Sequence, residues 1–125
     1  PLVRFLGGGA EESIRLSYII SVATPAEAEQ RAALAVSMGY TGFKVKVGMD
    51  PARDLEILRT VKAVAPQAFL WADANQGYDA ATAATQARRM EQIGVDCLEQ
   101  PVPANDWTGL RRVALDSALP IAVDE

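Results

Sequence analysis

The chain has 125 residues, 50% of them hydrophobic, and carries 12 Lys and Arg against 16 Asp and Glu, a formal net charge of −4. This acidic balance argues against nucleic acid and anionic membrane surfaces as partners. Charges interrupt every apolar run before the ~20 residues that a membrane span needs, so we expect a soluble, cytoplasmic protein. The absence of His and the presence of one Cys exclude a His base, an internal disulfide and a Cys zinc site within these residues. The chemistry must then depend on carboxylates, lysines, hydroxyls or a hard metal.

Predicted strands and helices alternate along the sequence. β-Branched and aromatic residues are concentrated in short runs that indicate strands, and apolar residues recur at helical spacing between these runs. Each predicted helix begins after a residue that can cap it, namely Thr24, Asp50, Asp79 or Asp106. In chain order we expect strand 15–22, helix 25–38, strand 42–47, helix 51–64, strand 68–72, helix 80–93, strand 95–98, helix 107–117 and strand 120–123.

This alternation predicts an α/β fold with a parallel sheet, because consecutive parallel strands need a crossover between them, usually a helix. Two architectures fit: a doubly wound open sheet, and part of a (β/α)8 barrel of the TIM type. In both architectures, the groups that carry out chemistry gather at the carboxyl ends of the strands. We therefore expect a functional site at those strand ends.

Charged residues stand at four of the five predicted strand ends. They are Lys44 and Lys46, then Asp73, then Glu99, and then the pair Asp124 and Glu125. The steps from Lys46 to Asp73, from there to Glu99 and from there to Asp124 are 27, 26 and 25 residues. A near-constant step places each group at the same height on successive strand–helix units.

Lys44 and Lys46 lie on one face of an apolar strand, since they alternate with Phe43, Val45 and Val47. Two unpaired ammonium groups ~7 Å apart on a buried strand would be unfavourable, so the lysines need anionic neighbours. The strand-end carboxylates can provide them. One interpretation of this pairing is structural, a salt-bridged plug inside a barrel.

The other interpretation is functional. Three carboxylates from neighbouring strands form an all-oxygen site suited to Mg²⁺. A lysine beside another lysine is expected to have a lowered pKa, which suits a general base. A divalent ion next to a lysine base is an arrangement that can remove a proton α to a carboxylate.

The residues at the strand ends resemble those of the enolase superfamily, specifically its mandelate racemase/muconate lactonizing enzyme branch. The matching segments are 43–48 (FKVKVG), 73–76 (DANQ), 98–101 (LEQP) and 123–125 (VDE). Residues 6–8 (LGG) also resemble the segment that leads from that family's capping domain into its barrel. The resemblance implies a partial (β/α)8 barrel with its first five strands and four helices. Residues 1–14 would then be a linker from a missing N-terminal capping domain, and residues 15–125 the N-terminal part of the barrel.

Carried over residue by residue, the resemblance implies a Mg²⁺ site held by Asp73, Glu99 and Asp124. It makes Lys46, the second lysine of the pair, the general base. It gives Lys44 two tasks, which are to tune that base and to contact the substrate carboxylate.

Three further residues are implied as supporting groups around the metal site or the substrate: Asn75, Gln100 and Glu125. The third metal ligand stays open between the last two residues of the chain, because the mandelate racemase subgroup uses Glu at this point. The step of 25 residues favours Asp124. The resemblance to the muconate lactonizing and dipeptide epimerase subgroups favours the same residue.

Three aromatic residues stand near these motifs. For Trp71, packing in the core and a place on the barrel interior are both open. Trp107, at the start of the last predicted helix, is expected to pack against the sheet. Tyr78 follows the turn after Asp73 and is near enough along the chain to reach the site, but no role is assigned to it.

The implied reaction is Mg²⁺-dependent abstraction of the α-proton of a small carboxylate substrate, with stabilisation of the enediolate that forms. The outcome can be racemisation or epimerisation, β-elimination of water by a dehydratase (a lyase), or cycloisomerisation. We expect the full-length parent enzyme to be a homo-oligomer. We expect the fragment alone to be inactive, because the family places a capping domain and further catalytic groups outside these residues.

Two alternatives remain from other classes. The chain could be a non-catalytic structural half-barrel, held together by the lysine–carboxylate plug. It could also be a doubly wound signalling receiver domain, which is about this long and has an Asp after its third strand, where this chain has Asp73. A receiver also needs an acidic pair after its first strand, and residues 21–24 (SVAT) do not supply one.

Overall fold

The computed structural model describes residues 2–8 and 14–125. The first range contains a short helix, α1 (Leu2–Phe5), which the sequence did not indicate. The linker predicted for residues 1–14 falls partly on residue 1 and residues 9–13, which lie outside the described residues, so this assignment stays a prediction. Among the described helices, none combines the length and the hydropathy needed to cross a membrane.

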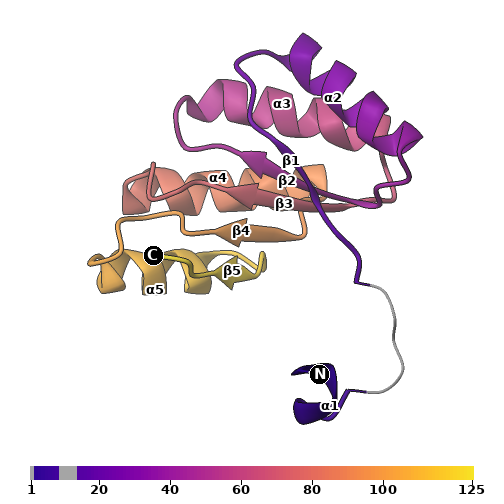
Figure 1. Cartoon of the computed structure of the whole chain (residues 1–125). Helices are drawn as coiled ribbons and strands as arrows, with labels where there is room; N and C mark the ends of the chain where they lie inside the picture. The colour runs from indigo at the N-terminus through magenta and orange to yellow at the C-terminus, as the bar shows by residue number, and fades with distance from the viewer. Residues whose placement is uncertain (1, 9–13) are drawn as a thin grey trace.

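Residues 14–125 form a five-stranded parallel sheet with one helix between each pair of consecutive strands (Figure 1). The strands are β1 (Tyr18–Ile20), β2 (Gly42–Lys46), β3 (Phe69–Asp73), β4 (Cys97–Glu99) and β5 (Ile121–Ala122). The helices are α2 (Pro25–Ser37), α3 (Pro51–Val64), α4 (Ala80–Ile93) and α5 (Trp107–Asp116). Neighbouring strands follow the chain order β1-β2-β3-β4-β5, and every pair is parallel.

Every strand and helix predicted from residue 15 onward is present, and the helices begin where the sequence indicated. Thr24 caps α2 through a capping box with Glu27, and Asp79 caps α4 by accepting a hydrogen bond from the backbone of the first turn. Gly94 follows α4 in the left-handed conformation, with φ 88°. Four of the five strands are shorter than predicted, because a strand is paired only along the length that its neighbour covers, whereas β3 keeps its predicted length and is shifted by one residue.

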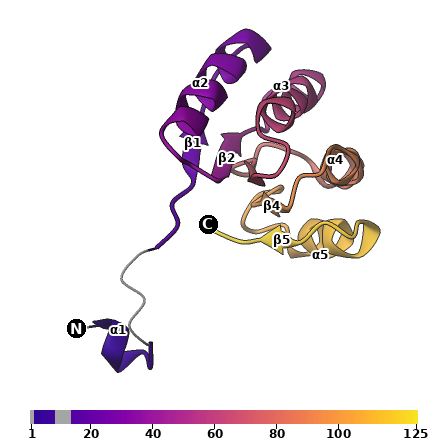
Figure 2. The same cartoon turned by 90° about the vertical axis from the view of Figure 1, so that its right-hand side faces the viewer.

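All four helices between the strands cover the same face of the sheet. Figure 2 shows α2 to α5 along the outer side of the curved sheet, with the end of the chain on the inner side. This one-sided cover follows from the sequential strand order, because each right-handed crossover returns to the next strand along. A receiver domain has the strand order 2-1-3-4-5. The receiver alternative is therefore wrong, and the architecture is that of a partial (β/α)8 barrel.

The hydrophobic core fills the space between the sheet and these helices. On β2, Phe43 and Val45 are fully buried on the helix side. Lys44 and Lys46 alternate with them and therefore lie on the inner, concave face. Packing against the helices thus fixes the face on which both lysines are presented.

The structure corrects the expectation for Trp107 and decides between the two alternatives for Trp71. Trp107 is 74% exposed, so its expected packing against the sheet is wrong. The buried face of α5 contains Gly109 and Val113, and Trp107 lies about 200° around the helix from Gly109. Trp71 on β3 is half-buried, with Lys44 Nζ 5.1 Å from its ring centroid, so it lies on the concave face.

Candidate metal centre and lysine pair

Strand pairing brings the predicted site residues to one edge of the sheet. Lys46 on β2 is directly opposite Asp73 on β3, which is directly opposite Glu99 on β4. Glu99 pairs with Ala122 on β5, so Asp124 lies two residues beyond this row. The near-constant step in the sequence therefore places three groups at one height, and the expectation that Asp124 shares that height is wrong.

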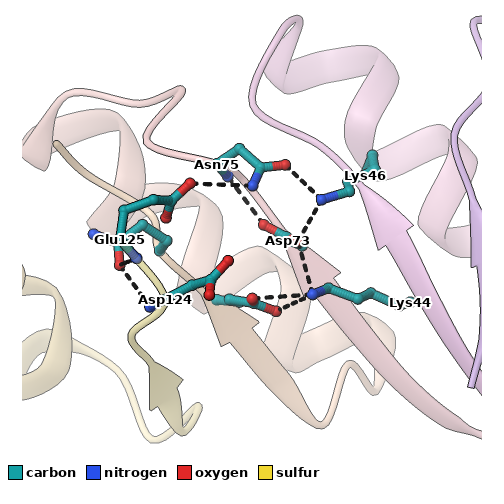
Figure 3. A network of polar contacts seen from close by, with 8 residues as sticks. Lys44, Lys46, Asp73, Asn75, Asp124 and Glu125 are labelled. Carbon is teal, nitrogen blue, oxygen red and sulfur yellow. Dashed lines mark hydrogen bonds and ion pairs between the residues drawn. The ribbon is translucent and has the colours of Figure 1, made fainter. Parts of the chain in front are cut away.

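Both lysines bind carboxylates of the neighbouring strands (Figure 3). Lys46 Nζ lies 2.6 Å from Asp73 Oδ2 and 2.7 Å from Asn75 Oδ1. Lys44 Nζ lies 3.0 Å from the same Asp73 oxygen and 2.7 Å and 3.0 Å from the two carboxylate oxygens of Glu99. The Asp73 side chain is fully buried, whereas that of Lys46 is 35% exposed. The anionic neighbours that the lysines require are thus the predicted ones, and Lys46 is the more accessible of the two.

These contacts shift the pKa values of the buried groups. Burial acts to raise the pKa of Asp73, but hydrogen bonds from Lys46, Lys44 and the Asn75 N–H outweigh it, so this pKa lies below its usual value. Burial acts to lower the pKa of Lys44, but hydrogen bonds to Glu99 and Asp73 and their charges outweigh it, so this pKa lies above its usual value. The expectation that one lysine lowers the pKa of the other is therefore wrong for Lys44, because this residue faces two carboxylates.

Amide groups hold the predicted ligands and the end of the chain in place. The Asn75 N–H donates to Asp73 Oδ1 (3.1 Å), and the Asn75 side-chain amide donates to Glu125 Oε1 (3.3 Å). Gln100, which is 2% exposed, accepts hydrogen bonds at Oε1 from the N–H groups of Asp124 (2.9 Å) and Glu125 (3.2 Å). Figure 3 shows the Asp124 side chain turned toward Asp73, whereas the Glu125 side chain is turned toward Asn75. This arrangement favours Asp124 over Glu125 as the third ligand, which stays a prediction.

The loops after β3 and β4 contain backbone conformations that non-glycine residues rarely adopt. Asn75, Gln76 and Gln100 have φ values of 42°, 68° and 38°. Such residues persist only where the surrounding structure holds them, and they are concentrated at functional sites. The Gln76 N–H donates to the Gln100 carbonyl (2.8 Å), and the Gln76 side chain accepts from the Ala104 N–H (2.9 Å). These contacts tie the two loops together next to the predicted ligands.

The donor atoms of this cluster are carboxylate oxygens, the ligands that Mg²⁺ prefers. Within residues 2–8 and 14–125, no group of three or more His, Cys, Asp or Glu side chains is close enough to hold a metal ion. Lys44 supplies the positive charge between Asp73 and Glu99 in this structure. The buried Oε2 of Glu99 lies 2.7 Å from Lys44 Nζ but outside hydrogen-bonding geometry, so this oxygen has an ion-pair contact and no hydrogen bond.

A second buried polar contact lies beside the site and involves residues to which the sequence assigned no role. The Tyr78 hydroxyl donates to Asp54 Oδ2 (2.7 Å), and the Gly48 N–H donates to the same oxygen (2.9 Å). Tyr78 is 4% exposed, so it is part of the core rather than of the open face. The sequence did carry a signal for Asp54, because it lies four and seven residues before the buried Leu58 and Val61, on the buried face of α3.

Comparison with known proteins gives consistent results. A sequence profile described as enolase C-terminal domain-like matches residues 27–125. The chain is 35% identical to the chloromuconate cycloisomerase CbnB of Cupriavidus necator, over 96% of this chain and 33% of that enzyme. The solved structure of a substrate-liganded L-Ala-D/L-Glu epimerase from Bacillus subtilis matches 99% of this chain with a TM-score of 0.91 and 33% identity, over 35% of that chain. A dipeptide epimerase from Cytophaga hutchinsonii, solved with Mg and the dipeptide D-Ala-L-Val, matches 99% of this chain with a TM-score of 0.89 and 31% identity, over 34% of that chain.

The chain spans about a third of the length of these relatives. The profile covers most of the chain, including every strand from β2 onward and both lysines. The structural matches confirm the partial (β/α)8 barrel. The chain therefore belongs to the enolase superfamily, within its mandelate racemase/muconate lactonizing enzyme family.

Proposed function

We propose that this chain forms the first five strands and four helices of the barrel of a longer enzyme, which removes the α-proton of a small carboxylate substrate. The outcome is racemisation or epimerisation, β-elimination of water, or cycloisomerisation. One observation carries the proposal: Lys44 and Lys46 meet the carboxylates of the next two strands at the carboxyl end of the sheet. The names of the relatives, which include a racemase, epimerases and cycloisomerases, support this reaction class.

In this proposal, Lys46 acts as the general base. Its side chain is 35% exposed on the concave face, so a substrate can reach Nζ. As a free amine, Nζ takes the α-proton of the substrate. The ammonium group that results is held by Asp73 Oδ2 and Asn75 Oδ1, which lie 2.6 Å and 2.7 Å away. The same two oxygens orient Nζ, and orientation is a large part of what a catalytic base requires.

In this proposal, Lys44 binds the substrate carboxylate. Its Nζ lies 5.1 Å from the centroid of the Trp71 ring, and this contact helps to fix the long side chain. The Lys44 side chain is 22% exposed, so it is partly open to the concave face. There it attracts the negative charge that grows on the substrate carboxylate as the α-proton leaves.

The residues at the strand ends fit Mg²⁺ as a cofactor. The donor set consists of carboxylate oxygens only, and buried Glu99 Oε2 has an ion-pair contact with Lys44 Nζ (2.7 Å) but no hydrogen bond. Asp73, Glu99 and Asp124 would hold the ion. When bound, the ion supplies positive charge beside the substrate carboxylate. The structure of the Cytophaga hutchinsonii dipeptide epimerase with Mg supports Mg²⁺ as the metal.

Two substrate classes are supported by the relatives. The complexes of the two epimerases, one with its substrate and one with a dipeptide, support an amino-acid or dipeptide derivative. A 3,6-anhydro-D-galactonate cycloisomerase from Zobellia galactanivorans, with a TM-score of 0.88 and 28% identity, supports a sugar acid. Both classes carry the carboxylate that the proposed reaction needs. The homo-oligomeric parent and its cytoplasmic location stay predictions from the sequence.

Exchange of the substrate α-hydrogen with deuterated solvent tests this function in the full-length enzyme. With a panel of dipeptides and sugar acids as probes, we expect Lys46→Ala to slow the exchange by about 10²–10⁴-fold, because it removes the base. Lys62→Ala is the matched control, since Lys62 bonds to the Ala68 carbonyl (3.1 Å) before β3, at the opposite end of the sheet. Exchange at the wild-type rate in Lys46→Ala would show that this base is wrongly assigned.

A second candidate function is supported by the ion pairs themselves. Lys44 and Lys46 already neutralise Asp73 and Glu99, as expected for the salt-bridged plug of a non-catalytic half-barrel. Such a plug would not bind a metal ion at the carboxylates. Magnesium binding therefore separates the two candidates.

A further inference from the structure

A buried hydrogen-bond network lies beside the lysine pair. The Tyr78 hydroxyl donates to Asp54 Oδ2 (2.7 Å), and the Gly48 N–H donates to both Asp54 Oδ2 (2.9 Å) and the Tyr78 hydroxyl oxygen (3.2 Å). Asp54 and Tyr78 are 5% and 4% exposed. The three residues come from the first turn of α3, from the loop after β2 and from the loop after β3. The network therefore joins two loops through one buried carboxylate.

The two loops are also in direct backbone contact. Gly48 has φ 98°, and a Cβ at this position would clash with the backbone of Ala74. A Cβ on Gly77 would clash with the Gly48 carbonyl. The Val47 N–H donates to the Asp73 carbonyl (2.9 Å), which extends the pairing of the strands into the loops. Because the two loops are in contact through their backbones, a displacement of one loop also displaces the other.

Each of these loops adjoins part of the Lys46 environment. Lys46 ends β2 immediately before the first loop, and Asn75 lies in the second loop, three residues before Tyr78. The contacts of Lys46 Nζ with Asp73 (2.6 Å) and Asn75 (2.7 Å) thus connect the end of β2 with the end of β3 and the loop that follows it. We propose that Asp54 and Tyr78 are positioning residues. Their hydrogen bonds with each other and with Gly48 form a lock between the two loops, which holds Lys46 within reach of Asp73 and Asn75.

The chemistry of the pair suits such a lock. Burial and the neighbouring Asp54 carboxylate raise the pKa of Tyr78 above its usual value, so the hydroxyl stays a proton donor at any pH at which an enzyme works. Removal of this hydroxyl leaves a buried carboxylate oxygen with the Gly48 N–H as its remaining donor among the described residues. An under-satisfied buried carboxylate favours opening of the loops. The positioning role rests on the proposed function of Lys46, whereas the lock is a property of the fold and is measured separately.

Two variants of the full-length protein test the lock. Tyr78→Phe keeps the ring and removes the hydroxyl, and Asp54→Asn keeps the size and removes the charge. By hydrogen exchange with mass spectrometry, we expect about tenfold faster amide exchange in residues 47–50 and 74–78 and unchanged exchange in residues 97–122. Lys62→Ala, which loses a hydrogen bond at the opposite end of the sheet, is the control and should leave both loops unchanged.

The same variants test the positioning role through turnover. Because Lys44 binds the carboxylate and only the base is displaced, we expect kcat for α-hydrogen exchange to fall about 10- to 100-fold in Tyr78→Phe, with KM within about twofold of the wild type. Asp54→Asn keeps an acceptor for the Gly48 N–H, so it should lower kcat less than Asp54→Ala does.

Several results would overturn the proposal. Unchanged loop exchange in Tyr78→Phe would show that there is no lock. Faster loop exchange with an unchanged kcat, or faster exchange throughout the chain, would show that Asp54 and Tyr78 serve stability alone. If the wild type shows no α-hydrogen exchange, or Lys46→Ala retains it, the proposed function fails and the positioning role fails with it. The loop exchange of Tyr78→Phe would then still report whether the lock exists.

Discussion

At the scale of single residues, Asp73 is the group on which both lysines converge. Its Oδ2 atom lies 2.6 Å from Lys46 Nζ and 3.0 Å from Lys44 Nζ, and its side chain is fully buried. A buried carboxylate is unfavourable without a counter-ion, and here two cations share one oxygen. A metal ion and the two lysines would therefore compete for the same small set of oxygens, and that competition is measurable.

Magnesium titration followed by Trp71 fluorescence measures the competition between the metal ion and the two lysines. An ion that binds Asp73 and Glu99 draws them away from Lys44, whose Nζ lies 5.1 Å from the Trp71 ring centroid. In the 125-residue chain with Trp107→Phe, Trp71 is the single tryptophan, and we expect a saturable change in its emission. Asp73→Asn in the same background should abolish the change. A flat titration up to millimolar Mg²⁺ would instead support the structural plug.

Gln100 gives a second prediction at this scale. It is 2% exposed, and its Oε1 accepts the N–H groups of Asp124 and Glu125. Gln100→Ala removes this acceptor, so we expect the free energy of unfolding to fall by about 1–3 kcal/mol more than for loss of packing alone. Gln86→Ala is the matched control for urea denaturation, because Gln86 is also 2% exposed and its Oε1 has no hydrogen-bond partner among the described residues. Equal losses in the two variants would contradict the prediction.

Residue-level contacts were predictable where periodicity alone sets them. The alternation on β2 puts Lys44 and Lys46 on one face, and the step to Asp73 makes strand-end neighbours of them, as the structure confirms. The sign of the Lys44 pKa shift was not predictable, because it depends on side-chain distances that sequence spacing does not contain. The contact of Tyr78 with Asp54 was not predictable either, because it depends on the path of two loops.

At the scale of elements, helix starts were predicted better than strand ends. A helix start is local: Asp50 and Asp106 cap α3 and α5 through backbone N–H groups within three residues. A strand exists only where a neighbour pairs with it, so β1 is limited to Tyr18–Ile20, opposite 43–45. Trp107 shows the same limit for packing, since its neighbours depend on how α5 lies on the sheet and not on its own sequence.

The N-cap of α4 predicts a pH dependence of stability. Hydrogen bonds from the N–H (2.8 Å) and hydroxyl (3.1 Å) of Thr82 hold the pKa of Asp79 below its usual value. The carboxylate form therefore stabilises the fold above the unfolded pKa of about 4, and this contribution is lost as the pH falls through the lower folded pKa. Asp79→Asn remains neutral and lacks this contribution at every pH. We expect the difference in urea midpoint between wild type and Asp79→Asn to shrink from pH 7 to pH 3, and a constant difference would contradict this assignment.

At the scale of the whole molecule, the sheet has two free edges within the part of the chain that the structure describes. β1 pairs only with β2, and β5 pairs only with β4. A closed barrel has no edges, whereas a free edge offers unpaired N–H and C=O groups to another chain. The concave face next to the β1 edge also exposes apolar surface, since Ile19, opposite Lys44, is 60% exposed. The site residues thus lie on a surface that the remaining strands of the proposed barrel would enclose.

These edges predict self-association of the 125-residue chain on its own. We expect sedimentation velocity to show a sedimentation coefficient that rises with concentration, because edge strands of two copies can pair. Ile19→Lys places a charge on the β1 edge strand and should shift the association to higher concentration by tenfold or more, about 1.4 kcal/mol in association free energy.

Leu115→Lys is the matched control, since Leu115 is 70% exposed on α5 and its substitution should leave the association unchanged. A chain that stays monomeric at all concentrations, or equal effects of the two lysines, would show that the edges are not the contact. Co-expression with the remaining barrel strands of the parent enzyme should suppress the association in the wild type, because those strands occupy both edges.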